Sequence, residues 1–179
     1  MKKIVLILTI FISMIGYANG GDNENEFSFF KETYINPRII EDMSTWISDT
    51  GDQIMVINLT DTQNSNRYYG DYNIRKGSNE FPIVEFEREE GNGGFGYEYI
   101  GKLNSGLEVI ETFDNGGGSL TSTEVVFFQI IKDKGMTFDT ENQKIIETDE
   151  RTLIYRVGSV GSYGYKNIEI INGKLKMEK

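Results

Sequence analysis

Carboxylates, lysines and tyrosines are the side chains through which this chain could do acid–base chemistry, because its 179 residues include no His and no Cys. The two absences exclude a thiolate nucleophile, a Ser-His-Asp triad and every metal site built on His or Cys ligands. A glycan-hydrolysing reaction remains chemically open, since it needs two facing carboxylates and no imidazole. Catalysis would therefore require two acidic residues that the fold brings face to face.

Glu111 and Asp114 form the acidic region best suited to such a role. Glu111 shares one face of its predicted strand with three apolar residues, so strict alternation would turn its carboxylate toward the core. An inward-facing acid is either paired with a base, such as Arg156 or Arg67, or functional. A structural salt bridge is the commoner outcome, so the sequence predicts no catalytic residue.

Tyrosines provide a second kind of candidate, because the chain contains 10 of them. Some alternate along a predicted strand and so share one face, and others cluster beside an Asn-rich loop. Exposed rings stack on sugars or anchor a protein partner, whereas buried ones are ordinary strand packing. The tyrosines predicted as a binding surface are Tyr68, Tyr69, Tyr72, Tyr97 and Tyr99.

Three consecutive glycines follow Asp114 and Asn115. Their spacing matches neither the phosphate-binding loop nor the dinucleotide fingerprint, and a turn or bulge explains them. We add Asp114 and Asn115, which precede these glycines, to the predicted binding surface. The oxygen-rich segment 61–66 lacks the ligand spacing of a calcium loop. The sequence therefore predicts neither a cofactor nor a metal site.

The first twenty residues have the pattern of a secretory signal peptide. Lys2 and Lys3 precede the apolar run Ile4–Ile15, and the small residues that follow suit cleavage after Ala18 or Gly20. A spanning helix would need about 20 apolar residues, and no Cys follows the run to carry a lipid anchor. We expect a periplasmic or secreted protein that is not a lipoprotein and has no membrane span in its mature form.

Acidic side chains outnumber basic ones, 28 to 18, which gives a net charge of −10. Loss of residues 1–20 would remove two Lys and no acid, so the mature chain would carry −12. This charge disfavours binding to nucleic acid or to anionic lipid. Solubility is one explanation of the charge, and a basic protein partner is the other. Without Cys, stability must come from packing.

One short helix is predicted over residues 36–47, followed by strands. Asn36 is a suitable N-cap and Pro37 suits the first helical position, and apolar residues then recur at helical spacing through Trp46. From residue 53 onward the apolar period changes to two, which is typical of strands. The predicted strands cover residues 53–60, 68–75, 81–88, 95–103, 107–113, 123–132, 151–157, 163–171 and 174–177, with a short one near 136–139.

Turn residues separate these strands. Asn172-Gly173 is the strongest hairpin pattern, because a type I′ turn needs positive φ at both positions; Asn104–Gly106 and Asp133–Gly135 suit longer turns. Residues 125–131 are apolar on both faces, so their strand should be central. We predict an all-β fold, an antiparallel sandwich or barrel of about 8–10 short strands with one short N-terminal helix. The predicted segments are a signal peptide at 1–20, a flexible acidic stretch at 21–26 and a single β-rich domain at 27–179.

Two segments resemble exported bacterial β-rich proteins of unknown function. They are Phe95–Ser119 (FGYEYIGKLNSGLEVIETFDNGGGS) and Val157–Met177 (VGSVGSYGYKNIEIINGKLKM), together roughly a quarter of the chain. A similar run of GY, GKL, SG and GGGS recurs in those proteins. The resemblance implies export and a β fold, and it transfers no activity and no site residue.

The sequence therefore predicts an exported bacterial envelope protein that acts as a non-enzymatic binding or inhibitor module. An immunity-type protein that neutralises a basic exported toxin would fit the charge. The second possibility is a carbohydrate-binding module that uses the tyrosines, and the least favoured is a carboxylate-dependent glycan hydrolase. The expected partner is a basic protein or a glycan.

Overall fold

The computed structural model describes residues 27–29, 34–44, 54–62, 68, 70–77 and 81–179, without the side chain of residue 90. The predicted signal peptide, the acidic stretch at 21–26, Trp46, Arg67 and Tyr69 lie outside these residues. In the described part of the chain, no helix is long and apolar enough to cross a membrane.

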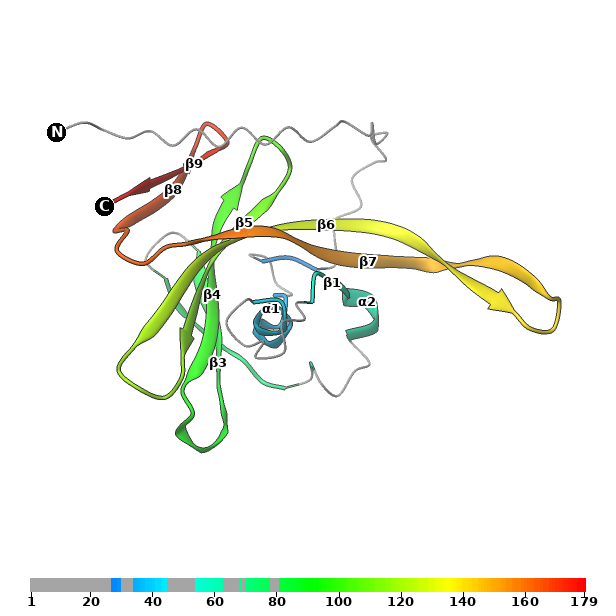
Figure 1. Ribbon diagram of the computed structural model, residues 1–179, viewed down its shortest axis with the longest axis horizontal. Helices are drawn as coiled ribbons and strands as arrows, with labels where there is room; N and C mark the ends of the chain where they lie inside the picture. The colour runs from blue at the N-terminus through cyan, green and yellow to red at the C-terminus, as the bar shows by residue number, and fades with distance from the viewer. Residues whose placement is uncertain (1–26, 30–33, 45–53, 63–67, 69, 78–80) are drawn as a thin grey trace.

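The described chain consists of nine strands, two short α-helices and one 3₁₀ turn at Glu89–Gly91 (Figure 1). The helices are α1 (Pro37–Asp42) and α2 (Leu59–Thr62). The strands are β1 (Val56–Asn58), β2 (Asn73–Lys76), β3 (Pro82–Glu87), β4 (Gly94–Lys102), β5 (Glu108–Asn115), β6 (Thr121–Asp139), β7 (Lys144–Gly161), β8 (Asn167–Ile171) and β9 (Lys174–Glu178). The prediction of an all-β fold with a short N-terminal helix is confirmed.

Helix α1 begins as the sequence predicts. The side chain of Asn36 accepts a hydrogen bond from the N–H of Arg38 at 3.0 Å, and Pro37 takes the first helical position, where its missing N–H leaves no bond unmade. The Asn36 amide also donates to the main-chain oxygen of Tyr68 at 2.9 Å. The cap residue therefore also joins α1 to the segment before β2. The helix ends at Asp42, before the predicted end.

Seven strands form one open antiparallel sheet in the order β1-β7-β6-β5-β4-β3-β2. Strands β2 to β7 are neighbours in chain order, and β1 joins the outer side of β7 through Val56–Asn58. Because β1 and β2 end the sheet without pairing with each other, the sheet is not a closed barrel. Strands β8 and β9 form a separate two-stranded sheet.

Alternation along the strands gives the large sheet two covered faces. On the first, which we call the helix face, Tyr97 and Val126 belong to the same buried cluster as Ile40 of α1. On the second, the hairpin face, Val125 is buried with Ile168 of β8. The prediction that residues 125–131 form a strand covered on both sides therefore holds for its first half.

The turn between β8 and β9 has the predicted conformation. Asn172 and Gly173 have φ values of 51° and 68°, as a type I′ turn requires at both positions. Asn104, in the turn between β4 and β5, donates from its side chain to the main-chain oxygen of Asn172 and from its N–H to that of Gly173, each at 3.0 Å. These bonds fasten the tip of the small hairpin to the large sheet.

The largest departure from the sequence prediction is the hairpin of β6 and β7. The predicted turn at residues 133–135 is wrong, because β6 continues through this segment to Asp139 and the turn lies at residues 140–143. Gly135, the last residue of the predicted turn, lies at a β-bulge, where the pairing shifts register between Lys134 and Met136. Gly in a strand often marks a bulge rather than a turn, and here it permits one long hairpin.

The predicted strand over residues 53–60 is also shorter in the structure. Strand β1 stops at Asn58, whose side-chain oxygen accepts a hydrogen bond from the N–H of Thr60 at 3.2 Å. This contact caps the start of α2 and satisfies one of its free N–H groups. The apolar alternation through Leu59 therefore continues into a helical turn rather than a strand.

Candidate functional site

Two of the predicted binding tyrosines belong to the core. Tyr97 has no exposed surface and Tyr99 is 4% exposed, both on the helix face. The hydroxyl of Tyr97 donates to the main-chain oxygen of Ile35 at 2.7 Å, and that of Tyr99 donates to Glu108 Oε2 at 2.6 Å. Burial raises the pKa of both hydroxyls above its ordinary value, which keeps them protonated. These two rings cannot form the exposed platform that sugar stacking requires.

The other predicted tyrosines do not complete such a platform. The hydroxyl of Tyr68 donates to Asp42 Oδ2 at 2.9 Å, which joins it to the end of α1. Tyr72 is half-buried against the helix-face cluster, and Tyr69 lies outside the described residues. Tyr163, which the prediction left out of the site, is 80% exposed. The fold therefore does not bring the described members of the set to one exposed surface.

Asp114 and Asn115, the remaining predicted site residues, are both held by Arg88. Its Nη2 donates to Asp114 Oδ1 at 2.7 Å and to Glu41 Oε1 at 2.6 Å. Its Nη1 donates to the main-chain oxygen of Asn115 at 2.8 Å. We call Arg88, Glu41 and Asp114 the Arg88 cluster. Because Glu41 belongs to α1 and Asp114 to β5, the cluster joins the helix to the sheet.

The Arg88 cluster is largely shielded from water, since the side chains of Arg88, Glu41 and Asp114 are 22%, 16% and 10% exposed. Burial raises the pKa of Glu41 and outweighs the opposing hydrogen bond from Arg88. Burial acts to lower the pKa of Arg88, but hydrogen bonds to Asp114 and Glu41 prevail and raise it. The positive charge of the Arg88 guanidinium therefore offsets the free-energy cost of burying the two neighbouring carboxylates of Glu41 and Asp114.

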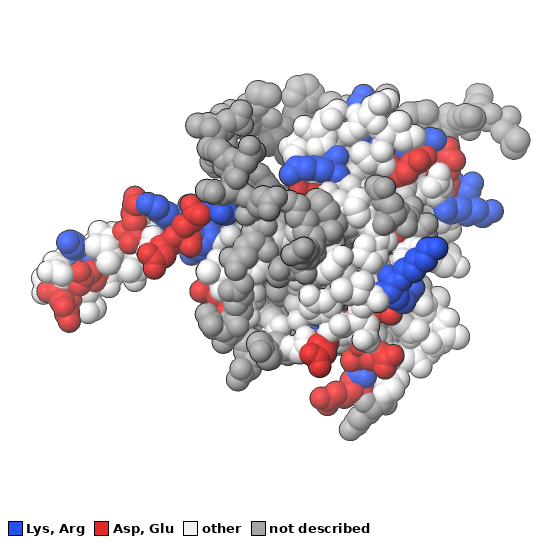
Figure 2. Space-filling model, turned by 180° about the vertical axis from the view of Figure 1, so that it is seen from behind, with Lys and Arg blue, Asp and Glu red and all other residues white. Residues whose placement is uncertain are grey.

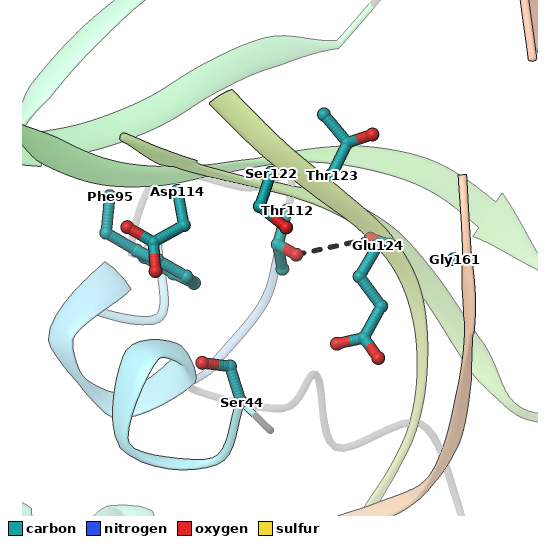
Figure 3. Close-up of a pocket in the computed structure, with 8 residues that line it drawn as sticks. All are labelled: Ser44, Phe95, Thr112, Asp114, Ser122, Thr123, Glu124 and Gly161. Carbon is teal, nitrogen blue, oxygen red and sulfur yellow. Dashed lines mark hydrogen bonds between the residues drawn. The ribbon is translucent and has the colours of Figure 1, made fainter. Parts of the chain in front are cut away.

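A hollow of about 160 Å³ lies beside this cluster on the helix face (Figure 3). Both of its carboxylates are ion-paired, Asp114 with Arg88 at 2.7 Å and Glu124 with Arg156 at 3.4 Å. Among the described residues, no three acidic side chains are placed to hold a metal ion. The hollow therefore offers hydroxyl groups and neutralised acids to a ligand. Its lining consists of Ser44, Phe95, Thr112, Asp114, Ser122, Thr123, Glu124 and Gly161.

Glu111 and Asp114 cannot act as a catalytic pair, because β5 carries them on opposite faces. The pairing of β5 with β6 is regular along the whole strand, so residues three apart project to opposite sides. Asp114 lies on the helix face, whereas Glu111 lies on the hairpin face, where Ser162 Oγ donates to its Oε1 at 2.8 Å. The partner suggested for Glu111, Arg156, pairs instead with Glu124 on the helix face.

Glu111 faces a second acid, Glu98, directly across the pairing of β4 and β5. Burial raises the pKa of Glu111, the hydrogen bond from Ser162 opposes this, and the charge of Glu98 adds to the rise. An acid of raised pKa beside a second carboxylate is what carboxylate catalysis needs. However, Glu98 has no exposed surface and neither acid lines the hollow. Glu111 is partly exposed, but a substrate cannot reach the buried carboxylate of Glu98, so the two acids do not form an accessible catalytic pair.

Replacing Glu111 by Gln is expected to stabilise the protein at neutral pH by up to about 1 kcal/mol, the range for like charges directly opposite across two strands. The Gln side chain still accepts the hydrogen bond from Ser162. Because the folded-state pKa of Glu111 is raised, the ionisation of Glu111 destabilises the fold increasingly as the pH rises above the unfolded value of about 4.3. The gain should therefore be small near pH 4 and larger at pH 7, as measured by urea unfolding.

Glu124→Gln is the matched control, because Glu124 faces Arg156 rather than an acid. This second substitution should destabilise the protein at pH 7, opposite in sign to Glu111→Gln. A loss of stability in both variants at pH 7 would contradict the prediction, since it would mean that the contacts of the Glu111 carboxylate outweigh its repulsion with Glu98.

The outer part of the β6–β7 hairpin projects from the body as a two-stranded arm (Figure 1). Strand β5 pairs with β6 only as far as Phe128, and β1 pairs with β7 only at Leu153–Tyr155. Farther out, β6 and β7 pair only with each other in the part of the chain that the structure describes. We define the arm as residues 132–151.

Three apolar side chains near the end of the arm are exposed to solvent. Met136 is 69% exposed, Phe138 58% and Ile145 71%. Phe138 and Ile145 are directly opposed, and Met136 is two positions from Phe138 on β6, so all three share one face. None belongs to either buried cluster. We call these three residues the apolar tip. Grouped exposed apolar side chains are typical of an interaction surface.

Cross-strand ion pairs and a capped turn give the arm its shape. Facing opposite charges fix strand register, although each exposed pair adds little stability. At the turn, the carboxylate of Asp139 accepts from the side-chain amide of Asn142 at 2.7 Å and from its N–H at 3.1 Å, which lowers the pKa of Asp139. The ion pairs are Lys132–Glu150 at 3.5 Å, Lys134–Glu147 at 3.3 Å and Arg151–Asp133 at 3.6 Å.

The arm carries more acid than base, with six acidic and four basic side chains between residues 132 and 151. Figure 2 shows charges of both signs side by side along it. The charged residues of the arm that do not belong to these three ion pairs are three acids, Asp139, Glu141 and Asp149, and one base, Lys144. The apolar tip therefore lies among excess negative charge.

Sequence reasoning missed the arm because it placed a turn at residues 133–135. Two patterns indicate the longer hairpin in retrospect. The charges of residues 132–134 are complementary to those of residues 147–151, and the apolar alternation of Met136 and Phe138 resumes at Ile145 across a polar turn. Both patterns become informative only when the two segments are aligned as partners.

No protein-family model, no curated protein and no solved structure matches the chain. A functional argument for this protein therefore depends on its own features, namely the Arg88 cluster, the hollow, the Glu98–Glu111 pair and the arm with its apolar tip.

Proposed function

We propose that the chain is an exported, non-enzymatic binding module that recognises another protein through the β6–β7 arm. The apolar tip is the observation that carries the proposal, because Met136, Phe138 and Ile145 are exposed and lie outside both buried clusters. Apart from the cross-strand pair of Phe138 and Ile145, an apolar group at the end of a projection adds little to the fold, and it lowers solubility. Contact with a partner accounts for it.

The charge of the chain supports a basic partner. The net charge is −10 over 179 residues and would be −12 after the predicted cleavage, which removes two Lys and no acid. Such a field attracts a basic protein over a distance of about 10 Å at moderate salt and speeds encounter. An immunity-type inhibitor that neutralises a basic exported toxin would have this charge, and the predicted signal peptide supports a periplasmic or secreted location.

The two alternative functions have less support. A carbohydrate-binding surface needs exposed rings, whereas Tyr97 and Tyr99 are packed in the core. A glycan hydrolase needs two carboxylates that face one substrate, whereas Glu111 and Asp114 project from opposite sides of β5.

Affinity capture at two salt concentrations tests the proposed function. The tagged mature chain is used as bait in an envelope extract of the producing cells, with an unrelated acidic protein of similar charge as control bait. We expect a protein that binds the chain, and not the control, at low salt and is depleted at high salt, where charge attraction is screened. Absence of a partner at both salt concentrations, or equal capture by the control bait, would contradict the proposal.

A further inference from the structure

The arm is already shaped before it meets a partner. Three ion pairs join its strands and the Asp139 turn closes its end. A preorganised element loses little conformational entropy on binding, which favours insertion into an existing site over folding on contact. An arm of this kind is suited to a receptor surface of fixed shape.

The apolar tip is too small for a flat interface. Its side chains, between 58% and 71% exposed, present on the order of 300–400 Å² of apolar surface. A stable interface buries about 800 Å² on each partner. A groove that encloses a two-stranded ribbon reaches that area, because it also covers the edges and the polar outer part of the arm. The size of the tip therefore favours a concave receptor surface.

The charges near the tip determine the chemistry of the rim of that groove. Glu141 and Asp149 form no ion pair within the described part of the chain, and Asp139 is held only by hydrogen bonds within the turn. The one basic residue left near them is Lys144. Lys and Arg side chains on the partner would meet these acids and steer the encounter.

Two other occupants fit these observations less well. A second copy of the chain would bring two acidic tips together, each on a protein of net charge −10, and two tips in contact bury less area than a stable dimer needs. A membrane surface would place Glu141 and Asp149 against anionic headgroups, which repel them. A basic protein with an apolar groove has neither difficulty.

We propose that the arm inserts its apolar tip into an apolar groove of a separate protein, with Lys and Arg side chains of that protein along the rim. This inference rests on the proposed function and adds the chemistry of the partner surface. Phe138 is the anchor, since an aromatic ring in a desolvated pocket contributes most of the energy of such interfaces. Glu141 and Asp149 contact the basic rim.

Site-specific cross-linking tests the occupant directly. A photo-reactive phenylalanine analogue replaces Phe138 in the full chain, and the same analogue replaces Tyr163, an 80% exposed residue of the body, as the control. After irradiation of the producing cells, we expect an adduct with one other protein from position 138 and not from position 163. The cross-linked peptide should map to an apolar groove flanked by Lys or Arg. An adduct with a second copy or with lipid, or equal yields at the two positions, would overturn the inference.

Charge reversal near the tip tests the basic rim. Glu141→Lys combined with Asp149→Lys should lower the cross-linking yield at position 138 about tenfold, which corresponds to about 1.4 kcal/mol. The matched control, Glu87→Lys with Glu89→Lys, reverses two exposed acids on the body and should change the yield less than twofold. Circular dichroism checks that both variants are folded. An unchanged yield in the arm variant would overturn the basic rim.

The two proposals can fail separately. If affinity capture retains a salt-sensitive partner but position 138 gives no adduct, the partner binds elsewhere and only the arm inference is wrong. If capture also fails, the proposed function is wrong as well.

Discussion

Replacing Arg88 by Met is expected to lower the free energy of unfolding by about 2–3 kcal/mol at pH 7, because it leaves Glu41 and Asp114 without the cation between them. Removing one partner of a buried ion pair costs about 3–5 kcal/mol. The three side chains retain 10–22% of their exposure, so water reduces the effect. Urea unfolding at constant ionic strength measures the difference.

The loss caused by Arg88→Met should depend on pH. Burial already raises the pKa of Glu41 in the wild type, and removal of the guanidinium takes away the group that opposes this rise. A carboxyl group whose folded-state pKa is raised destabilises the fold as the pH rises above about 4.3. The variant should therefore be closer to the wild type near pH 4 than at pH 7.

Arg75→Met is the control, because Arg75 pairs with Glu85 at the surface, where the two side chains are 53% and 31% exposed. An exposed pair contributes about 0–1 kcal/mol, so this variant should lose much less stability than Arg88→Met. Equal losses in the two variants, or a loss in Arg88→Met that is the same at pH 4 and pH 7, would show that the cluster does not fasten α1 to the sheet.

Truncating Tyr97 to Ala is expected to cost about 3–5 kcal/mol of stability, as for other large aromatic residues in a core. Tyr97 has no exposed surface, and its ring meets that of Phe29 edge to face with centroids 5.5 Å apart. Tyr97→Phe keeps the ring but leaves the main-chain oxygen of Ile35 without its donor, so a smaller loss of about 1–2 kcal/mol is expected. Chemical denaturation of both variants measures these losses.

Tyr163→Ala provides the comparison for the same residue type outside the core. Tyr163 is 80% exposed, and surface substitutions usually change stability by less than about 0.5 kcal/mol. If Tyr97→Ala is as stable as Tyr163→Ala, the ring of Tyr97 lies outside the core. That result would support the carbohydrate-binding alternative, which needs an exposed ring.

The sequence predicts those parts of the fold that depend on residues close together in the chain. Asn36 and Pro37 begin a helix through their own φ and a side-chain contact two residues away. Asn172-Gly173 produces a type I′ turn because both residues tolerate positive φ. Apolar alternation predicts most of the strands, since period two is a property of the extended backbone itself.

The candidate site was predicted less well, because its members depend on which face of the sheet they reach and on what covers that face. Alternation shows that Tyr97 and Tyr99 share one face of their strand. It does not show whether that face is exposed for binding or buried in the core, and in this sheet both faces are covered. Alternation also implies that Glu111 and Asp114 diverge, once β5 is known to be regular. The acid that faces Glu111 across the strands, Glu98, follows only from the register of β4 and β5.

By itself, then, the sequence determined an all-β protein, its turns at Asn172-Gly173 and Asn104–Gly106, and its negative charge. Only the tertiary structure decided that β6 passes through residues 133–135 and that Arg88 joins Glu41 to Asp114. Both depend on contacts between residues distant in the chain. A turn at 133–135 is locally acceptable, but the backbone of β6 pairs with β7 through this segment as far as Asp139, and Lys132, Asp133 and Lys134 there face opposite charges on β7. Such pairings are not visible until the fold places the two segments side by side.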